Sequence, residues 1–473
     1  MYSEANVPST GEEESLLVVQ SYDDLSRKLW RLEGLPLSIT AVQGAHPALR
    51  YTQVFPPVPL KMDYSFFDKE KTSRSLVPKE GKPCPAYITP ITVICHMEGS
   101  GKWPHDRLAI RHIRTPSTSA WENVWKDGLV FRIQVAYHRE PQVLRESVNA
   151  VGLLVVRDNE KAQALEMATN HKPILTSTLH GRSTRVSGQL CRLAKRWLGA
   201  QLFSEDITED TADLLVASLF LQPAPFTPPG FSQLAGKALT PLSLVSDYTE
   251  IKNDFMASRE SLPVMFIATP KRRNNPCGPR KDPLYREQEV MMLQRVVMVA
   301  AESLKLLEHQ LMDSNQTQDV RVVMRPPLDA YDVLIQLNPK QVPLLVQAVD
   351  PPTVTFSRGA IAGSAGQTGG ALPGLQPCDP LLGRAQMYEK EAFGDLALFF
   401  CDPHGGTVIA VLWKPKAFMP TPFKTSQLSA RSVEVTGDEA KTIPNVEAIL
   451  EDFCVMGKGL IKSVEARTEK WSF

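Results

Sequence analysis

Clustered lysine and arginine side chains are the groups in this sequence that are best suited to bind a ligand. Residues 171–204 contain no aspartate or glutamate. Phosphates are bound by local clusters of cations, whatever the net charge of the whole chain. We therefore predict contact between this stretch and a phosphate backbone such as that of RNA. The six candidate residues are Lys172, Arg182, Arg185, Arg192, Lys195 and Arg196.

Helical spacing is expected to place part of this cluster on one surface. Arg192, Lys195 and Arg196 lie three to four residues apart, as the charges of one helix stripe do. We expect this stripe to be exposed. The other face of the helix offers apolar side chains to a core: Leu190, Leu193, Trp197 and Leu198.

A second basic cluster stands in a stretch rich in proline, asparagine and glycine. Lys271, Arg272 and Arg273 precede Arg280 and Lys281. Cations in such a loop can follow a phosphate backbone or serve as a nuclear-import signal. The alternative hypothesis for the first cluster is a solvated basic face that answers the acidic run after it. That run consists of Glu205, Asp206, Glu209, Asp210 and Asp213.

Motifs for catalysis and metal binding are incomplete. Gly101 and Lys102 lack the earlier glycine and the following hydroxyl residue of a phosphate-binding loop. His96-Met97-Glu98 lacks the Pro-Cys-x-x-Cys that completes the metal site of zinc deaminases. No Gly-x-Ser-x-Gly turn is present. We predict no catalytic residue, no metal site and no cofactor.

Alternating and helical patterns predict an α+β protein with several domains. In the first part we expect a helix over 15–32, β-strands over 37–42, 49–55, 88–95 and 129–137, and helices over 186–203 and 209–221. Further on we expect a strand over 262–267, a long helix within 286–312, strands over 331–337, 396–401 and 407–413, and a helix over 445–465. Residues 351–383 are rich in glycine, proline and alanine and predict a flexible loop. The strands over 396–401 and 407–413 should form a hairpin.

Composition places the chain among globular proteins of a reducing compartment. Of its 473 residues, 43% are hydrophobic and 22% charged, with 52 basic and 52 acidic residues, so any basic surface must be local. The seven cysteines are scattered, and acidic residues near the N-terminus oppose a secretory signal. We expect a soluble protein.

Several long segments together resemble one protein family, the nucleolar RNA-associated (Nrap) family. They cover nearly the whole chain, so a chance match of one motif does not explain them. The segments are Trp103–Ile113, Lys126–Arg132, Ala136–Gln142, Arg192–Trp197, Pro225–Pro229, Arg325–Asp329, Glu391–Phe400 and Pro444–Phe453.

The resemblance implies a fold, a location and partners. It implies a degenerate nucleotidyltransferase-like domain over 1–165, a helical domain like those of poly(A) polymerase and oligoadenylate synthetase over 166–325, and an α+β domain over 326–473, together a C-terminal portion of the family's full length. Family members act in the nucleolus, within the nucleus, in the small-subunit processome, which processes pre-18S ribosomal RNA. The implied partners are pre-ribosomal RNA, U3 ribonucleoprotein, a ribosomal RNA processing protein and casein kinase 2.

The residues themselves bear on whether the nucleotidyltransferase-like domain is active. Nucleotidyl transfer needs paired carboxylates on a strand to hold metal ions and the triphosphate. After Gly44 and Ala45, where such folds place a Gly-Ser turn, no acidic residue appears before Asp63, and the expected strand carries Arg50 instead. We predict a non-enzymatic RNA-associated scaffold. The alternatives are a protein-docking scaffold without RNA contact and, more remotely, an active nucleotidyltransferase.

Two segments depart from the family pattern. Between Ile113 and Val124 a turn-like stretch replaces an expected apolar helix, and between Pro229 and Glu250 a strand-bearing segment is replaced. A splice variant or a fragment of the family protein would explain both. We expect such a chain to be less stable than its relatives, because core surface and strand edges become exposed.

Overall fold

The protein is described by a computed structural model. It describes residues 11–35, 37–57, 59, 89–99, 123–148, 154–156, 160–180, 185–204, 207–221, 283–312, 320–342, 348–349, 393–422, 431–436 and 439–467. The chain forms two compact units. The first comprises Met1–Ala194, Glu209–Arg286 and Leu372–Cys378, and the second Lys195–Thr208, Glu287–Ala371 and Asp379–Phe473.

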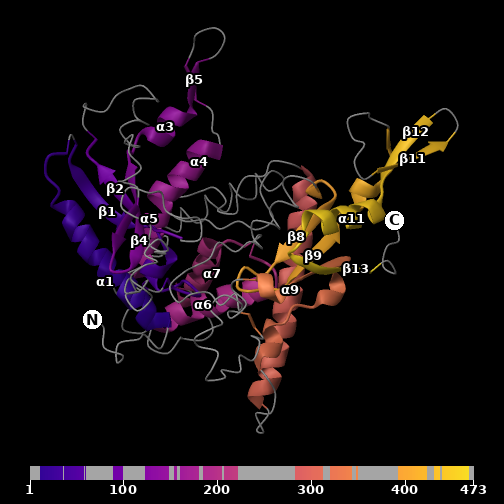
Figure 1. Ribbon diagram of the computed structural model, residues 1–473. Coiled ribbons are helices and arrows are strands. Elements are labelled where there is room, and N and C mark those ends of the chain that lie inside the picture. Colours follow the sequence, from indigo (N-terminus) through magenta and orange to yellow (C-terminus); the bar gives the residue numbers. More distant parts are fainter. Residues whose placement is uncertain are drawn as a thin grey trace, which may run out of the picture. The chain divides into compact units, whose positions relative to one another are not determined.

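A four-stranded sheet with one helix along it forms the core of the first unit (Figure 1). Its strands β1 (Ile39–Gly44), β2 (Ile91–Met97), β3 (Asn123–Lys126) and β4 (Leu129–Ala136) stand in the order β1-β2-β4-β3, and β2 and β4 are parallel. Helix α1 (Gly11–Trp30) buries Val18, Leu25 and Leu29 against this sheet. Alternation along β2 turns Val93 toward α1 and Ile94 to the other face.

The turn between β3 and β4 is fixed to α1 by a hydrogen bond. Asp127 and Gly128 both have positive φ, 53° and 78°, as a two-residue hairpin turn requires. The Ser21 hydroxyl of α1 donates to Asp127 Oδ2 at 2.5 Å. Hydrogen bonds from Lys126 and Ser21 hold the pKa of Asp127 below its usual value. The hairpin and α1 therefore keep one relative position.

The strand predicted over 49–55 was wrong. Residues Pro47–Arg50 form a short 3-10 helix, η2, and Tyr51 follows it in the left-handed region at φ 60°. The N–H of Ala48 donates to His46 Nδ1 at 3.3 Å, which caps the turn, and Pro47 supplies a φ suited to a helix start. The sequence signal for this turn, His-Pro after a strand, was present but outweighed by the β-rich residues after it.

Helices complete the described part of the first unit. A short helix α3 (Glu140–Arg145) leads to the hairpin of β5 (Glu146–Val148) and β6 (Leu154–Val156). Helix α4 (Glu160–Glu166) continues through a π-helical turn, η4 (Met167–His171), into α5 (Lys172–His180). Helix α6 (Arg185–Ala200) spans the division between the units after Ala194, and α7 (Glu209–Leu221) follows.

A buried arginine joins η2 to two of these helices. The Arg50 side chain is 0% exposed, and its Nε donates to Asp213 Oδ2 at 2.8 Å, while Nη2 donates to Asp210 Oδ1 at 2.6 Å. Its Nη1 donates to the Thr176 hydroxyl of α5 at 3.3 Å, and the Thr52 hydroxyl also donates to Asp213 at 2.9 Å. Burial opposes the charge of Arg50, but Asp213 and Asp210 outweigh it and raise its pKa. The ion cluster thus fastens α5 and α7 to the end of β1.

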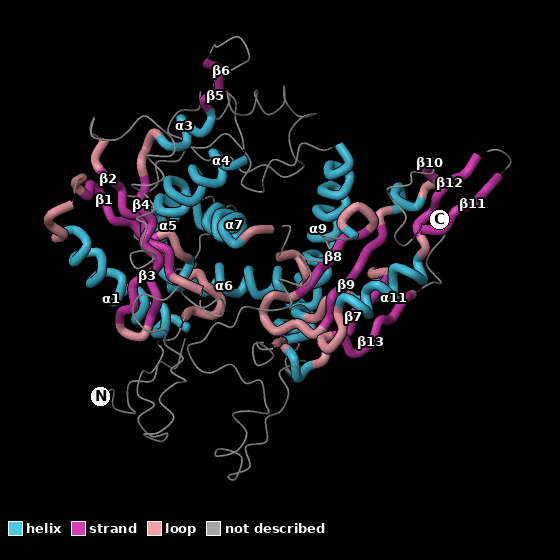
Figure 2. The backbone as a smooth tube through the Cα atoms, turned by 45° about the horizontal axis from the view of Figure 1, so that its top comes forward, coloured by secondary structure: helices cyan, strands magenta, loops and turns pink. Residues whose placement is uncertain are grey.

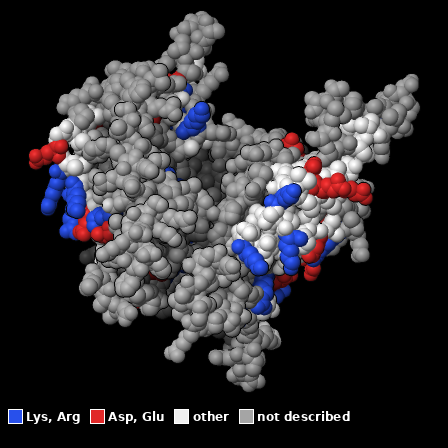
Figure 3. Space-filling view, in the orientation of Figure 1, with Lys and Arg blue, Asp and Glu red and all other residues white. Residues whose placement is uncertain are grey.

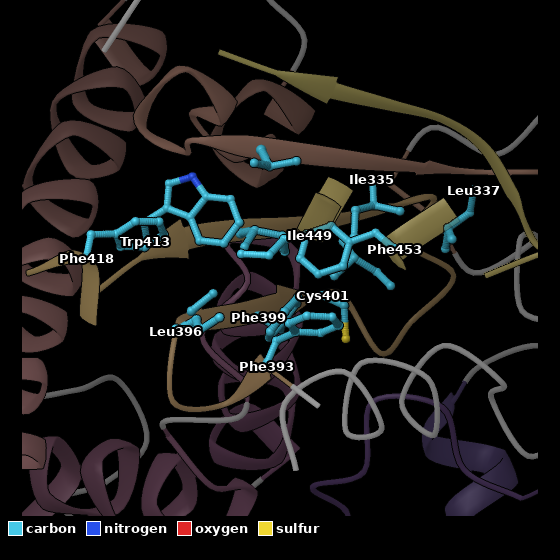
Figure 4. Packing of buried hydrophobic residues seen from close by; sticks show 14 of the residues in the cluster. Ile335, Leu337, Phe393, Leu396, Phe399, Cys401, Trp413, Phe418, Ile449 and Phe453 are labelled. Atoms are coloured by element: carbon cyan, nitrogen blue, oxygen red, sulfur yellow. The ribbon is translucent and has the colours of Figure 1, made fainter. Parts of the chain in front are cut away.

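The second unit has a four-stranded antiparallel sheet as its core. Strands β7 (Val333–Leu337), β8 (Ala397–Cys401), β9 (Val408–Trp413) and β13 (Ile461–Ala466) stand in the order β13-β7-β9-β8. The hairpin of β8 and β9 confirms the prediction. Helix α11 (Val446–Met456) lies beside this sheet (Figure 2). Its fully buried Phe453 has ring contacts with Phe393, Phe399 and Trp413 (Figure 4).

The helix predicted over 445–465 was wrong in its second half. Helix α11 ends at Met456, Gly459 turns the chain at φ 88°, and β13 pairs with β7. Gly457 is the C-cap of the helix at φ −89°, and Gly459 supplies the left-handed conformation that turns the chain after a helix end. The apolar residues of β13 had been counted as continued helix.

The remaining described elements of the second unit are a long helix, short 3-10 turns and a small sheet. Helix α9 (Pro283–Met312) confirms the long helix, and Arg295 of α9 lies 4.0 Å from the centre of the Tyr331 ring. The 3-10 turns are η5 (Val320–Met324), η6 (Leu328–Ala330), η7 (Pro339–Gln341) and η10 (Pro415–Phe418). The small sheet has the order β10-β12-β11, from β10 (Thr421–Pro422), β11 (Arg431–Thr436) and β12 (Glu439–Pro444).

Several predictions fall on residues outside the described ranges. These are the strand over 262–267, the loop over 351–383, and most of the two segments that depart from the family pattern. Within the described ranges, no helix is long and apolar enough to cross a membrane.

The ring cluster around Phe453 predicts a large loss of stability on truncation. Phe453→Ala removes a buried ring from three aromatic contacts and should lower the free energy of unfolding by about 3–5 kcal/mol. Hydrogen exchange of β8 and β9, followed by mass spectrometry, measures this loss. Val455→Ala, whose side chain is 71% exposed on the same helix, is the control and should change little. Equal effects would contradict the packing described.

The buried cation predicts a second, electrostatic loss. Arg50→Met keeps the length of the side chain but leaves the buried Asp213 carboxylate without its cation, so we expect a cost of about 3–5 kcal/mol. Hydrogen exchange in η2 and α7 measures it. The control is Arg27→Met, which breaks an exposed pair with Asp24 and should cost less than about 1 kcal/mol. Asp213→Leu added to Arg50→Met should restore part of the loss, and failure to do so would contradict the coupling.

Candidate nucleic-acid interface

The described members of the predicted basic cluster lie on α5 and α6. Lys172 begins α5 with a side chain that is 44% exposed, and its Nζ lies 3.7 Å from Asp210 Oδ2. Arg185 begins α6. Arg182 and the second cluster, Lys271, Arg272 and Arg273, lie outside the described residues.

The buried and exposed faces of helix α6 differ from those predicted. Lys195 is only 5% exposed and lies on the buried stripe with Gly188, Cys191 and Leu198. Two leucines expected in the core are exposed instead, Leu190 at 41% and Leu193 at 54%. The predicted exposed stripe of Arg192, Lys195 and Arg196 was therefore wrong. The apolar residues of α6 do gather on one stripe, but Leu190 and Leu193 of that stripe are exposed and Lys195 of the opposite stripe is buried, so the spacing indicated the wrong face.

Arg196 binds a carboxylate of the second unit. Its Nη1 donates to Asp402 Oδ2 at 3.0 Å, and both side chains are largely buried, at 14% and 9% exposure. Asp402 Oδ1 accepts from the backbone N–H of His404 at 2.9 Å, so this carboxylate also shapes the turn between β8 and β9. A Cβ on Gly199 would lie 3.3 Å from Asp402 Oδ1. The glycine thus allows α6 to approach the turn closely.

Two further side chains, at the C-terminal end of α6 and just after it, also bind residues of the second unit. Trp197 Nε1 donates to the Ser303 hydroxyl of α9 at 3.2 Å. Gln201 Nε2 donates to the carbonyl oxygens of Val323 at 2.9 Å and Arg325 at 3.2 Å. The end of α6 is therefore a docking segment within the second unit, and Arg196 takes part in it.

Arg192 remains partly accessible. It is intermediate in exposure, and it interacts with Glu14 of α1. Burial raises the pKa of Glu14, while the charge of Arg192 partly offsets this rise. The hypothesis of a basic face that answers the acidic run is correct for Lys172 with Asp210. Asp213 and Asp210 chiefly serve Arg50, which sequence spacing did not link to them.

The sheet of the first unit is poor in groups that hold metal ions. Its strands β1, β2, β3 and β4 contain no aspartate or glutamate. Across the described residues, no group of three or more His, Cys, Asp or Glu is placed to hold a metal ion. The buried ion that follows β1 is the cation Arg50, and the carboxylates of Asp213 and Asp210 are engaged in pairing with it.

A cavity that sequence patterns did not indicate lies on the sheet of the first unit. Its volume is about 430 Å³, and its polar lining includes Thr40, Gln43, His96 and His138. Burial lowers the pKa of His96, so this side chain is neutral at neutral pH. The lining of this cavity contains no carboxylate to hold a magnesium ion and no lysine or arginine to bind a triphosphate.

Comparison with known protein families divides the chain into three consecutive matches. Nrap protein nucleotidyltransferase domain 4 matches residues 2–116 and 117–184. Nrap protein PAP/OAS1-like domain 5 matches residues 185–237 and 240–326, and Nrap protein domain 6 matches residues 328–464. The breaks in the first two matches fall within the two segments that depart from the family pattern.

Relatives match almost the whole chain. Nucleolar protein 6 of Xenopus laevis is 45% identical over 504 aligned positions, which cover 98% of this chain and 43% of that protein. Nucleolar protein 6 of Homo sapiens is 46% identical over 510 positions, with the same coverage. Nucleolar protein 6 of Drosophila willistoni is 28% identical and covers 95% of this chain and 38% of its own length.

These comparisons agree with the predicted fold class, an α+β protein with several domains. The chain spans less than half the length of the curated relatives it matches. The vertebrate alignments are longer than the 473 residues of the chain, so the relatives have residues that this chain lacks. With three consecutive domains of one family matched in order, the chain belongs to the Nrap family.

Proposed function

We propose that this chain is a non-catalytic, RNA-associated scaffold of ribosome biogenesis. The single observation that carries the non-catalytic part is Arg50, a buried cation held by Asp213 and Asp210 directly after β1. In an active nucleotidyltransferase, carboxylates near this turn would face metal ions and the triphosphate. Here the nearest carboxylates neutralise an arginine, and the strands of the sheet supply no others. A fold can persist as a binding surface after its chemistry is lost.

Nucleolar RNA association is supported by family membership. The matched relatives are named Nucleolar protein 6. On this basis we assign the chain to the nucleolus and to the small-subunit processome, in pre-18S ribosomal RNA processing. Its proposed partners are pre-ribosomal RNA, U3 ribonucleoprotein, a ribosomal RNA processing protein and casein kinase 2.

A protein-docking scaffold without direct RNA contact is the second candidate. The docking role of Arg196 and the burial of Lys195 favour it, because these cations are not available to phosphates. Of the described candidates for RNA contact, Lys172 and Arg192 retain accessible side-chain surface. The two candidate functions therefore differ in whether Lys172 and Arg192 contribute to RNA binding.

Absence of catalysis is tested by primer extension. The purified chain, with Mg²⁺ or Mn²⁺, labelled ATP or UTP and an RNA primer, should add no nucleotide. A mock preparation from cells without the chain controls for contaminating polymerases. Extension that follows the protein through size exclusion and exceeds the mock preparation would contradict the proposal.

RNA contact through α6 is tested by comparing two arginines. Arg192→Ala should weaken RNA binding and make the log-affinity against log-salt slope shallower by about 0.7–0.9 if it contacts a phosphate. Arg196→Gln should leave this slope unchanged and instead reduce hydrogen-exchange protection in the turn between β8 and β9, because it loses its bond to Asp402. If neither variant changes the slope, α6 acts in docking alone. If Arg196→Gln changes the salt slope of RNA binding but leaves hydrogen-exchange protection of the turn between β8 and β9 unchanged, the docking role of Arg196 is contradicted.

A further inference from the structure

Three lysines gather at one end of the sheet in the second unit. Strand β7 ends at Leu337, which pairs with Ile461 at the start of β13. Lys340 follows β7 within η7, Lys458 precedes β13, and Lys462 stands on it. The N–H of Asn338 donates to the Leu460 carbonyl at 2.8 Å, which fixes the two chain segments side by side.

All three side chains are exposed, and no salt bridge holds any of them within the described part of the chain. Residues 333–349 and 453–464, which carry them, contain no aspartate or glutamate. The turn between β8 and β9 brings Asp402 to the same end of the sheet, but Arg196 binds that carboxylate. The three lysines therefore place positive charge at this end of the sheet, while Asp452 and Glu465 stand just beyond the second of these stretches.

The backbone holds these lysines apart from the core. A cap fixes η7, because the Lys340 N–H donates to Asn338 Oδ1 at 3.1 Å. Lys458 lies between Gly457 and Gly459, and Lys462 is the extra residue where the β13 register shifts between Ile461 and Ser463. Because Leu337 at the end of β7 pairs with Ile461 at the start of β13, the lysine that follows β7 and the two beside the start of β13 come to the same end of the sheet, where flexible side chains can reach phosphates of one RNA strand. Figure 3 shows Lys and Arg side chains interspersed with Asp and Glu side chains over the described part of the second unit.

We propose that Lys340, Lys458 and Lys462 form a contact site for the phosphate backbone of single-stranded RNA. The site reads charge rather than base sequence, because lysine binds phosphate as a point charge. This proposal rests on the proposed RNA association and specifies the residues that contact the RNA. An acidic protein segment would be attracted by the same charges, and the test separates the two.

The test measures binding of the whole chain to a fluorescent 20-nucleotide oligouridine at several salt concentrations. The variant Lys340→Ala/Lys458→Ala/Lys462→Ala should bind more weakly, with a slope shallower by about 2, since each phosphate contact on a single strand contributes about 0.7. The control Arg27→Ala/Arg145→Ala/Arg467→Ala removes the same charge from arginines already held by carboxylates. It should change the slope little.

The outcomes separate the site from the function. If the wild type binds and both triple variants behave alike, the lysine site is wrong while RNA association stands. If the wild type does not bind oligouridine at all, both fail. If the lysine variant loses binding only to a polyglutamate probe, the site serves an acidic protein instead. Lys458→Glu should weaken oligouridine binding further than Lys458→Ala, and equal effects would also overturn the proposal.

Discussion

The buried charge of Arg50 is the constraint on which the first unit depends. A guanidinium group that is 0% exposed loses its water and must be paired within the protein. Asp213 and Asp210 come from a helix more than 150 residues away in the sequence, so pairing requires α7 to lie against the end of β1. Thr176 places α5 in the same cluster. One side chain thus joins the matched domains 4 and 5 across their boundary.

The same constraint supports the proposal that this sheet does not transfer nucleotides. Carboxylates that hold metal ions must be free of strong cations, whereas Asp213 and Asp210 are bound to Arg50. The same two carboxylates would be needed both to pair with Arg50 and to bind metal ions. The charged groups near the turn after β1 bind one another and hold α5 and α7 against the end of β1. This arrangement supports the proposed function as a scaffold, in which the fold positions binding surfaces.

The sequence predicted elements better than surfaces. Strands β7, β8 and β9 and helices α1, α7 and α9 were predicted because alternation or helical periodicity was strong in each. Helix α6 was predicted as an element, but its buried face was not, because Gly199 packs against Asp402 and His404, which lie far away in the sequence. A run without carboxylates looked like a binding surface, yet Arg196 finds its carboxylate 206 residues further on. Long-range pairs of this kind leave no local signal.

We propose that RNA association of this chain does not use Lys195 or Arg196 at the end of α6. Ultraviolet crosslinking of the chain to RNA in cells, followed by mass spectrometry of the crosslinked peptides, tests it most directly. We expect crosslinks to pre-ribosomal RNA on peptides that contain Lys340, Lys458 or Lys462, and none on Lys195 or Arg196. Crosslinks concentrated on residues 195–200, or none to RNA anywhere in the chain, would contradict it.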